Sequence, residues 1–319
     1  MLFGKDAMKY ALIADIHGNM PALSAVIADA RAKGVRSFVF LGDYCIGLAN
    51  PNEVADCIRS LSCSYVVGGN EDTCFSHLTS DNWQTQPRGQ YEAVPYYYGL
   101  LTEENRKFLR DLPGELTIDI NFAPPVHLFH KPQHYFDQCS PCLLNPQYYA
   151  DGIDRTLFSG ESFYSHSRNM LNCDESLKAK LASLSDGVYA FGHTHIQWSW
   201  RYEKKLLIST GSCGLPLDFN RDAAYCILEW TGTDWIVKLY RVPYDVDGTV
   251  SHTKNSDCAK GLPVWLGVIG RELETAREQA VPFVRFAEKY AMEIGDPVRP
   301  FTADTWYAAY DIWSGLYSD

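Results

Sequence analysis

Residues 10–19 read Tyr-Ala-Leu-Ile-Ala-Asp-Ile-His-Gly-Asn. The first five residues form a short apolar run, which predicts a buried strand, and the run ends in Asp15 and His17. A helical pattern follows from Pro21 to Lys33, with proline at a position that favours the first turn of a helix. The chain therefore places a carboxylate and an imidazole where a strand gives way to a helix.

The same order of strand, polar ending and helix is repeated. The apolar run 37–41 ends in Asp43, and the run 64–67 ends in Asn70, with a helix predicted over 52–61 between them. Alternating strands and helices predict parallel strands joined by crossover helices. Open sheets of this kind bind ligands at the carboxyl ends of their strands, which is where these polar residues stand.

The second half of the chain is β-rich and supplies two more polar endings. The run 126–129 ends in His130, and the run 188–191 leads into Gly-His-Thr-His, which contains His193 and His195. Two histidines one residue apart, just beyond a strand, do not both fit easily into a core, so the pair favours metal binding. Further strands are predicted over 115–120, 197–202, 205–209, 224–230 and 235–242, and further helices over 103–110 and 175–184.

Two regions depart from this regular pattern. Residues 131–173 are irregular, rich in Tyr, Phe, Asn and Pro, and too long for a simple connection, so they are interpreted as a functional loop or an inserted subdomain. The C-terminal region is helical in pattern, with helices expected over 271–291 and 303–316. We therefore expect one domain over 1–260, which contains the insertion, and a helical extension over 261–319 packed on it.

Composition limits the classes of ligand. Of the 319 residues, 46% are hydrophobic and 21% are charged, which is ordinary for a globular protein, and the formal net charge is -11. An acidic chain without a cluster of Lys and Arg is not expected to bind a nucleic-acid backbone. A phosphate substrate would then need a local positive centre, which bound metal ions can supply.

The sequence also bears on the cellular location. Residues 1–7 contain Lys5 and Asp6 and lack the apolar run of a signal peptide. No segment approaches the roughly 18–20 apolar residues that a membrane helix needs. We therefore expect a cytoplasmic protein that makes no membrane contact and whose cysteines are reduced thiols.

The polar endings share one kind of chemistry. Each delivers an oxygen or nitrogen ligand and none delivers a thiolate, a mixture that suits divalent Mn, Fe, Zn or Ni. A single Asp-x-His or Gly-Asp is weak evidence, but five such pieces in order, all at strand ends, predict a metal site. The candidate ligands are Asp15, His17, Asp43, Asn70, His130, His193 and His195.

These pieces, in this order, resemble the pattern of calcineurin-like metallophosphoesterases of the small bacterial and archaeal kind. The family pattern is D-x-H, G-D, G-N-H-D or a variant, a lone His, and G-H-x-H. Here it corresponds to residues 15–17, 42–43, 69–72, 130 and 192–195. The resemblance spans residues 9–240 and implies a four-layer α/β/β/α sandwich of two mixed sheets with helices outside.

The resemblance also implies a two-metal centre. Asp15, His17 and His195 would hold one metal, Asn70, His130 and His193 would hold the other, and Asp43 would bridge both. A hydroxide that bridges the metals would attack the phosphate, because two bound dications lower the pKa of water towards about 7. The residues expected to act in catalysis are Asp43, Asn70, Glu71 and His193.

Glu71 is the departure from the family pattern, which commonly has histidine at this position. An ionised Glu71 would repel a dianionic phosphomonoester more than a monoanionic diester. A protonated Glu71 could act as a general acid. Both interpretations favour a diester or nucleotide-type substrate, and the alternative is that Glu71 simply faces solvent. The next residue, Asp72, either belongs to the first turn of a helix or orients a ligand.

Four other residues have candidate roles at the site or in the fold. Asn19 either contacts substrate or caps the helix that begins near Pro21. Arg221 is a candidate phosphate contact. His134 is the alternative to His130 if the predicted strand register is wrong, and His127, on the opposite face of that strand, is interpreted as structural.

The function that these observations favour is hydrolysis of a phosphate ester by a dinuclear metal centre, with a small-molecule diester or nucleotide-type substrate slightly preferred. One alternative is a serine/threonine-type protein phosphatase or a phosphomonoesterase. Another, of a different class, is a catalytically weak metal-dependent sensor or scaffold. The C-terminal extension either covers the active site or forms a contact in a homo-oligomer.

Overall fold

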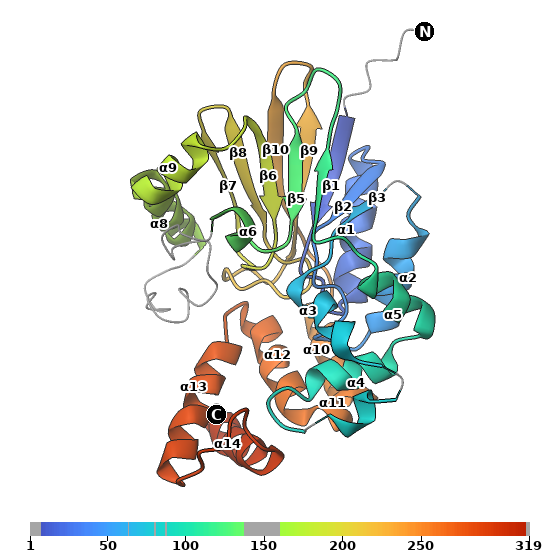
Figure 1. Cartoon of the computed structure of the whole chain (residues 1–319), viewed down its shortest axis with the longest axis vertical. Coiled ribbons are helices and arrows are strands. Elements are labelled where there is room, and N and C mark those ends of the chain that lie inside the picture. Colours follow the sequence, from blue (N-terminus) through green and yellow to red (C-terminus); the bar gives the residue numbers. More distant parts are fainter. Residues whose placement is uncertain (1–7, 63, 80, 87, 137–159, 317–319) are drawn as a thin grey trace.

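The computed structural model describes residues 8–62, 64–79, 81–86, 88–136 and 160–316. Two five-stranded mixed sheets form its centre (Figure 1). In the first sheet the order is β10-β9-β1-β2-β3, with β1, β2 and β3 parallel and β9 antiparallel to both of its neighbours. The bounds are β1 Met8–Ile13, β2 Ser37–Phe40, β3 Ser64–Val66, β9 Ala223–Trp230 and β10 Trp235–Val242.

The second sheet has the order β4-β5-β6-β8-β7, in which β5, β6 and β8 are parallel and the two edge strands are antiparallel to their neighbours. All the strands match the sequence prediction to within a few residues. Their bounds are β4 Glu115–Ile118, β5 Val126–Phe129, β6 Gly187–Phe191, β7 Gln197–Tyr202 and β8 Lys205–Thr210.

The layers follow from the two-residue period of the strands. In β1, Ala11 and Ile13 face a core that includes residues of α1 (Met20–Ala32) and α2 (Pro51–Ser60), whereas Leu12 faces the second sheet. On the far face of the second sheet, α9 (Glu175–Ala182) packs against β6. Helices therefore cover the outer faces of two stacked sheets, which confirms the predicted four-layer sandwich.

Several helix boundaries confirm the local signals. The side chains of Thr102 and Asp174 accept the backbone N–H of Asn105 and Leu177, and so cap α5 (Glu103–Arg110) and α9. The remaining helices between the sheets' strands are α3 Asn70–Thr73, α4 Ala93–Leu100, α6 Gln133–Phe136 and α8 Gly160–Cys173, with 3-10 turns at Cys74–His77 and Trp83–Thr85.

The prediction that residues 131–173 are irregular was wrong in part. Residues 133–136 and 160–173 are helical, and 137–159 lie outside the described residues. A short helix such as α6, which buries Phe136, is too brief to show a period of 3.6 residues in the sequence.

The helix predicted over 271–291 is also interrupted. α12 (Pro263–Thr275) ends before Ala276, whose φ is 49°, and α13 begins at Ala280. Pro282 lacks a backbone N–H and its ring would clash with the carbonyl four residues earlier, so it is tolerated only in the first turn of a helix. Two helices precede the first predicted C-terminal helix, α10 Val246–Asn255 and α11 Asp257–Gly261, and the last two helices are α13 Ala280–Glu293 and α14 Ala303–Gly315.

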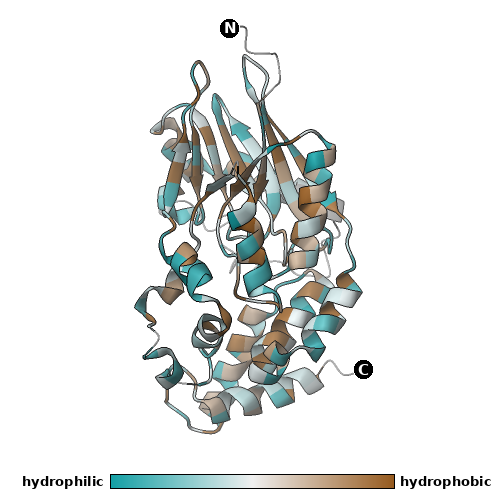
Figure 2. Cartoon of the chain, turned by 90° about the vertical axis from the view of Figure 1, so that its right-hand side faces the viewer, coloured by the Kyte–Doolittle hydropathy of each residue, from teal (hydrophilic) through white to brown (hydrophobic). Residues whose placement is uncertain are grey.

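The C-terminal helices lie at the end of the sandwich where the parallel strands terminate (Figure 1). Hydrophobic and hydrophilic bands alternate along them (Figure 2), and their apolar faces enclose a core that includes Phe283 and Trp306. Trp265 Nε1 donates to the carbonyl of Gln90 at 2.9 Å, and Tyr307 Oη donates to Glu92 at 2.7 Å. The division into residues 1–260 and 261–319 stays a prediction. Among the helices of the described ranges, none is long and apolar enough to cross a membrane.

Candidate metal centre

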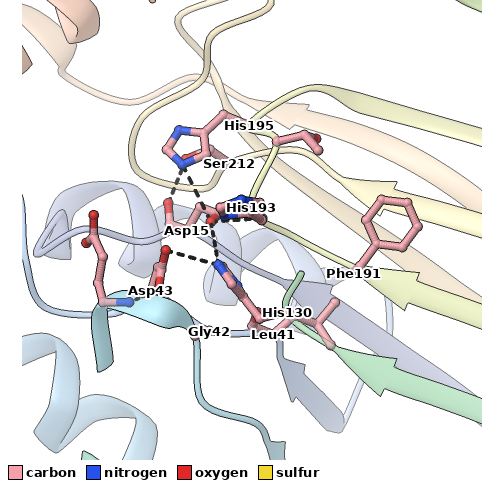
Figure 3. Close-up of polar contacts among 12 residues, drawn as sticks. Asp15, Leu41, Gly42, Asp43, His130, Phe191, His193, His195 and Ser212 are labelled. Atoms are coloured by element: carbon pink, nitrogen blue, oxygen red, sulfur yellow. Dashed lines mark hydrogen bonds and ion pairs between the residues drawn. The ribbon is translucent and has the colours of Figure 1, made fainter. Parts of the chain in front are cut away.

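The polar residues that follow the parallel strands meet in one cluster, and Figure 3 shows Asp15, Asp43, His130, His193 and His195 close together. Asp15, Asp43 and Asn70 follow strands β1, β2 and β3 of the first sheet. His130 follows β5, and the Gly-His-Thr-His segment follows β6 of the second sheet. Both sheets therefore contribute side chains to one cluster, because the carboxyl ends of their parallel strands point the same way.

The first group of candidate ligands contains Asp15, His17 and His195, whose ligand atoms lie within 4.8 Å of one another. Nε2 of His17 is 3.1 Å from Nε2 of His195, which is 3.5 Å from Oδ1 of Asp15. These are the three residues expected to hold one metal.

The second group contains Asp43, His130 and His193, again within 4.8 Å. Nε2 of His130 lies 3.0 Å from Oδ2 of Asp43. Asp43 also belongs to a set with His17 and Glu71, so its carboxylate is near both groups, as a bridging ligand requires.

The hydrogen bonds of three histidines orient their rings. Nδ1 of His17, His130 and His195 lies 2.7, 2.6 and 2.7 Å from the carbonyl oxygens of Ile46, Leu41 and Leu215. A carbonyl only accepts, so each Nδ1 carries a proton, and the ring presents its Nε2 lone pair to the cluster once the Nε2 proton has been lost. Two such lone pairs 3.1 Å apart, in His17 and His195, repel unless a cation or a proton lies between them, which fits a metal ligand pair.

A buried polar atom without a partner gives a second test of whether these residues could hold a metal ion. Oδ1 of Asn70 is buried and makes no hydrogen bond. An orphaned amide oxygen is costly, because it has lost its water without replacement. Together with the carboxylates and imidazoles, it completes an oxygen and nitrogen donor set that suits a borderline divalent metal.

The titration of the cluster reflects its burial and crowding. Burial raises the pKa of Asp15 to about 7. Burial acts to lower the pKa values of His17 and His130, but neighbouring carboxylates, chiefly Glu71 for the first and Asp43 for the second, raise them to about 10 and about 9. Burial and the nearby His130 lower the pKa of His193 to about 3. A divalent ion would therefore displace protons held by this cluster.

The backbone at the cluster is strained. Positive φ values, between 52° and 69°, are found at five of the candidate ligands, Asp15, His17, Asp43, His193 and His195. Residues other than glycine rarely adopt this region, and such strain is concentrated at functional sites. Close packing leaves room only for glycine nearby, since a Cβ at Gly69 would lie 2.1 Å from Oδ1 of Asp43.

Asp72 connects two of the strand-end loops. Its buried carboxylate accepts the backbone N–H of Asp43 and Gly69, both at 2.8 Å, and that of Tyr44 at 3.2 Å. Both roles considered from the sequence are present: Asp72 lies in the first turn of α3, and its bonds hold the backbone of Asp43, a candidate ligand.

Glu71 lies beside the first group. Its Oε2 atom is 3.1 Å from Nδ1 of His17, and its backbone N–H donates to Oδ1 of Asp43 at 2.9 Å. The side chain is 31% exposed and lines the cavity above the cluster, so it does not simply face solvent. Burial raises the pKa of its carboxyl. A carboxylate oxygen of Glu71 and ligand atoms of His17 and Asp43 lie within 4.8 Å of one another, which makes Glu71 an additional candidate ligand. The sequence did not predict this role.

The structure does not bring every candidate into the cluster. Asn19 is fully buried as the cap of α1, where its Oδ1 accepts the N–H of Ala22 and its Nδ2 donates to Gly214 and Tyr244, which favours the capping role. Arg221 forms an ion pair with Asp247 and is not among the described residues that line the cavity.

The alternative histidines also lie elsewhere. His134 pairs with Glu115 at 2.7 Å on the surface, and His127 stacks on Tyr189 at 4.7 Å between ring centres. His130 is thus the histidine of this segment that reaches the cluster.

Comparison with known proteins agrees with the fold. The family model of the calcineurin-like phosphoesterase superfamily domain matches residues 8–233. An uncharacterized protein of Methanocaldococcus jannaschii is 29% identical over 262 residues, which cover 81% of this chain and 95% of that protein.

Two crystal structures share the fold. A metallophosphoesterase from Sphaerobacter thermophilus has 21% identity and a TM-score of 0.58, over 85% of this chain and 100% of that one. A hypothetical protein from Pyrococcus horikoshii has 18% identity and a TM-score of 0.56, over 82% of this chain and 97% of that one. With the match to the family over most of its length, the chain belongs to the calcineurin-like phosphoesterase superfamily.

Proposed function

We propose that the protein hydrolyses a phosphate ester with two divalent metal ions held by the seven candidate ligands. The observation that supports this most strongly is the pair of ligand groups, one with His17 and His195 and one with His130 and His193, on either side of Asp43. Structural metal sites are usually closed and four-coordinate, whereas this cluster opens into a cavity.

When bound, the two ions supply a water of lowered pKa and Lewis-acid stabilisation of the phosphate oxygens. Asp15, His17 and His195 would hold the first ion, and Asn70, His130 and His193 the second. The Asp43 carboxylate, fixed by the N–H of Glu71, would be shared by both and set their spacing. Hydrogen bonds from Nδ1 to main-chain carbonyls keep three of the imidazoles oriented with Nε2 inward.

We further propose that Glu71 shifts the preference towards diesters or nucleotide-type esters. Its carboxyl lies in the cavity beside His17, where an ionised form would repel a dianionic monoester more than a monoanionic diester. A protein phosphatase is less well supported, since α12 and α13 contribute a wall of the cavity and restrict access for a peptide.

The test is to load the full-length protein with Mn²⁺, Fe²⁺, Zn²⁺ or Ni²⁺ and to compare a bis-aryl with a mono-aryl phosphate. We expect turnover of both, faster for the diester, and a smaller diester preference in Glu71→Gln when the two proteins are compared at equal metal content. A clear preference of the native protein for the monoester would contradict the role of Glu71. Absence of turnover with every metal would instead indicate the sensor or scaffold.

A further inference from the structure

The candidate metal centre forms one wall of a cavity whose opposite wall belongs to the C-terminal helices. The cavity has a volume of about 390 Å³ and is lined on one side by residues of the cluster, including His17, Asn70 and His193. On the other side it is lined by α12 and the start of α13, including Trp265, Ile269 and Ala280. This volume is at the lower end of the range for small-molecule sites, roughly 300–1,000 Å³.

Most of the remaining lining is apolar. Side chains of α4 and of the loops after β2 and β8 contribute, among them Ile46, Val94, Tyr97, Leu215 and Leu217. The organic part of a bound ester would therefore exchange water for apolar surface, which favours a compact apolar group.

The charges in the lining are of one sign. Among the described residues around the cavity, Asp43, Glu71, Glu272 and Glu278 carry carboxyl groups, and none is Lys or Arg. Bound metal ions would neutralise the charge near Asp43 and one phosphate group, but no Lys or Arg among the described residues lines the rest of the cavity. A second phosphate or a carboxylate on the organic group would therefore meet carboxyl groups and no Lys or Arg of the described lining.

Glu272 and Glu278 are rigidly held at the wall opposite the cluster. They are 4% and 8% exposed. Oε1 of Glu272 accepts the N–H groups of Gln279 and Ala280 at 2.9 and 3.0 Å, and Oε1 of Glu278 accepts that of Val281 at 2.9 Å. Burial, followed by the neighbouring Glu278, raises the pKa of Glu272 well above its usual range, so the pair carries less charge than two separate carboxylates.

We infer that the substrate is a compact phosphate ester whose organic group is apolar, bears no second anionic group, and presents a cation or a hydrogen-bond donor to Glu278. This inference rests on the proposed function and adds the chemical class of the ester. It makes the α12–α13 turn a specificity element, although the turn lies about 260 residues after Asp15 and His17 in the sequence.

The experiment compares three aryl phosphates that carry an aminomethyl, a hydroxymethyl or a carboxymethyl group at the same ring position, so that the methylene insulates the leaving group from the substituent. With the metal-loaded full-length protein, kcat/KM should fall in that order, by roughly tenfold between the first and the last. The matching non-hydrolysable aryl phosphonates should show the same order of affinity by calorimetry.

Two variants assign the effect to the proposed residue. In Glu278→Gln the side-chain oxygen can still accept the N–H of Val281, and the preference for the aminomethyl compound should shrink several-fold. Glu274→Gln is the matched control, because Glu274 is only four residues away at the end of α12, pairs with Lys254 on the surface, and does not line the cavity. It should leave the order unchanged.

The outcomes separate the two proposals. Equal rates and affinities for the three compounds, or preference for the carboxymethyl compound, would overturn the inference while leaving phosphate-ester hydrolysis intact. Binding of the phosphonates in the expected order without turnover of any ester would support the inference about the cavity and contradict the proposed hydrolysis.

Discussion

Asp43 is the residue on which both groups of candidate ligands depend. One oxygen lies 3.0 Å from Nε2 of His130, and the other accepts the N–H of Glu71 at 2.9 Å. Asp43→Asn keeps the shape of the side chain but removes the charge that two neighbouring dications need. We expect the dialysed variant to retain fewer than two metal ions per chain and to lose about a hundredfold or more of its hydrolytic rate. Elemental analysis and kinetics check this, and a variant that keeps both ions and full activity would exclude the bridging role.

Asp72 illustrates a residue that acts on a ligand through the backbone. Asp72→Ala would leave three buried N–H groups, of Asp43, Tyr44 and Gly69, without their acceptor. The free energy of unfolding should fall by about 2–4 kcal/mol, with weaker metal binding, since an unsatisfied buried donor costs about 1–3 kcal/mol and the loop can partly relax. Asp72→Asn keeps one acceptor oxygen, so its free energy of unfolding should lie between those of the native protein and the alanine variant. Urea unfolding measures the effect, and equal stability of the alanine variant and the native protein would argue against it.

Among the elements, the turn between α12 and α13 has a pH dependence of its own. The folded protein holds the proton of Glu272 to a higher pH than the unfolded chain, whose carboxyl titrates near 4.5. The folded state then binds more protons, so the stability contributed at this position falls as the pH rises above that value. In Glu272→Gln the side-chain oxygen can still accept the two N–H groups, but the amide does not titrate, so stability is not lost at this position as the pH rises. We expect its melting temperature, relative to the native protein, to increase from pH 5 to pH 8. A difference that stays constant with pH would show that Glu272 titrates normally.

The elements also show which signals in a sequence are reliable. Caps at Thr102 and Asp174, and the two-residue period of the strands, are set by neighbouring residues and were predicted correctly. The interruption at Ala276 was missed, because the apolar period continues across it and only the position of Pro282 reveals the restart. α4 was missed as well, since its run of tyrosines carries little helical period.

At the scale of the whole molecule, the candidate metal ligands join the two sheets. They follow strands of both sheets, so bound ions would cross-link the sandwich at one end. Metal ions bind the folded state, and at a hundred times the dissociation constant this adds about 2.7 kcal/mol to its stability. Removal of metal with a chelator should therefore lower the melting temperature, and added Mn²⁺ should restore it.

This stabilisation should itself depend on pH. In the metal-free fold, the pKa values of Asp15, His17 and His130 are raised to about 7, about 10 and about 9, so these groups hold protons that compete with metal. Raising the pH from 6 to 8 removes part of that competition, and the metal-induced rise in melting temperature should increase. Scanning calorimetry with and without Mn²⁺ tests this. A metal effect that decreases over the same range would contradict these protonation states.

Local patterns were enough to predict the alternation of strands and helices, the family, and the residues that meet in one cluster. The reason is that strand period, capping and the position after a strand are properties of neighbouring residues. The packing of distant segments was needed to show that Glu71 lies beside His17, that Asn19 is a cap, that Arg221 is paired elsewhere, and that Glu272 and Glu278 line the cavity. Each of these contacts depends on which distant segments pack together. That packing is set by the balance of burial and contact energies over the whole chain, and no short segment of sequence specifies it.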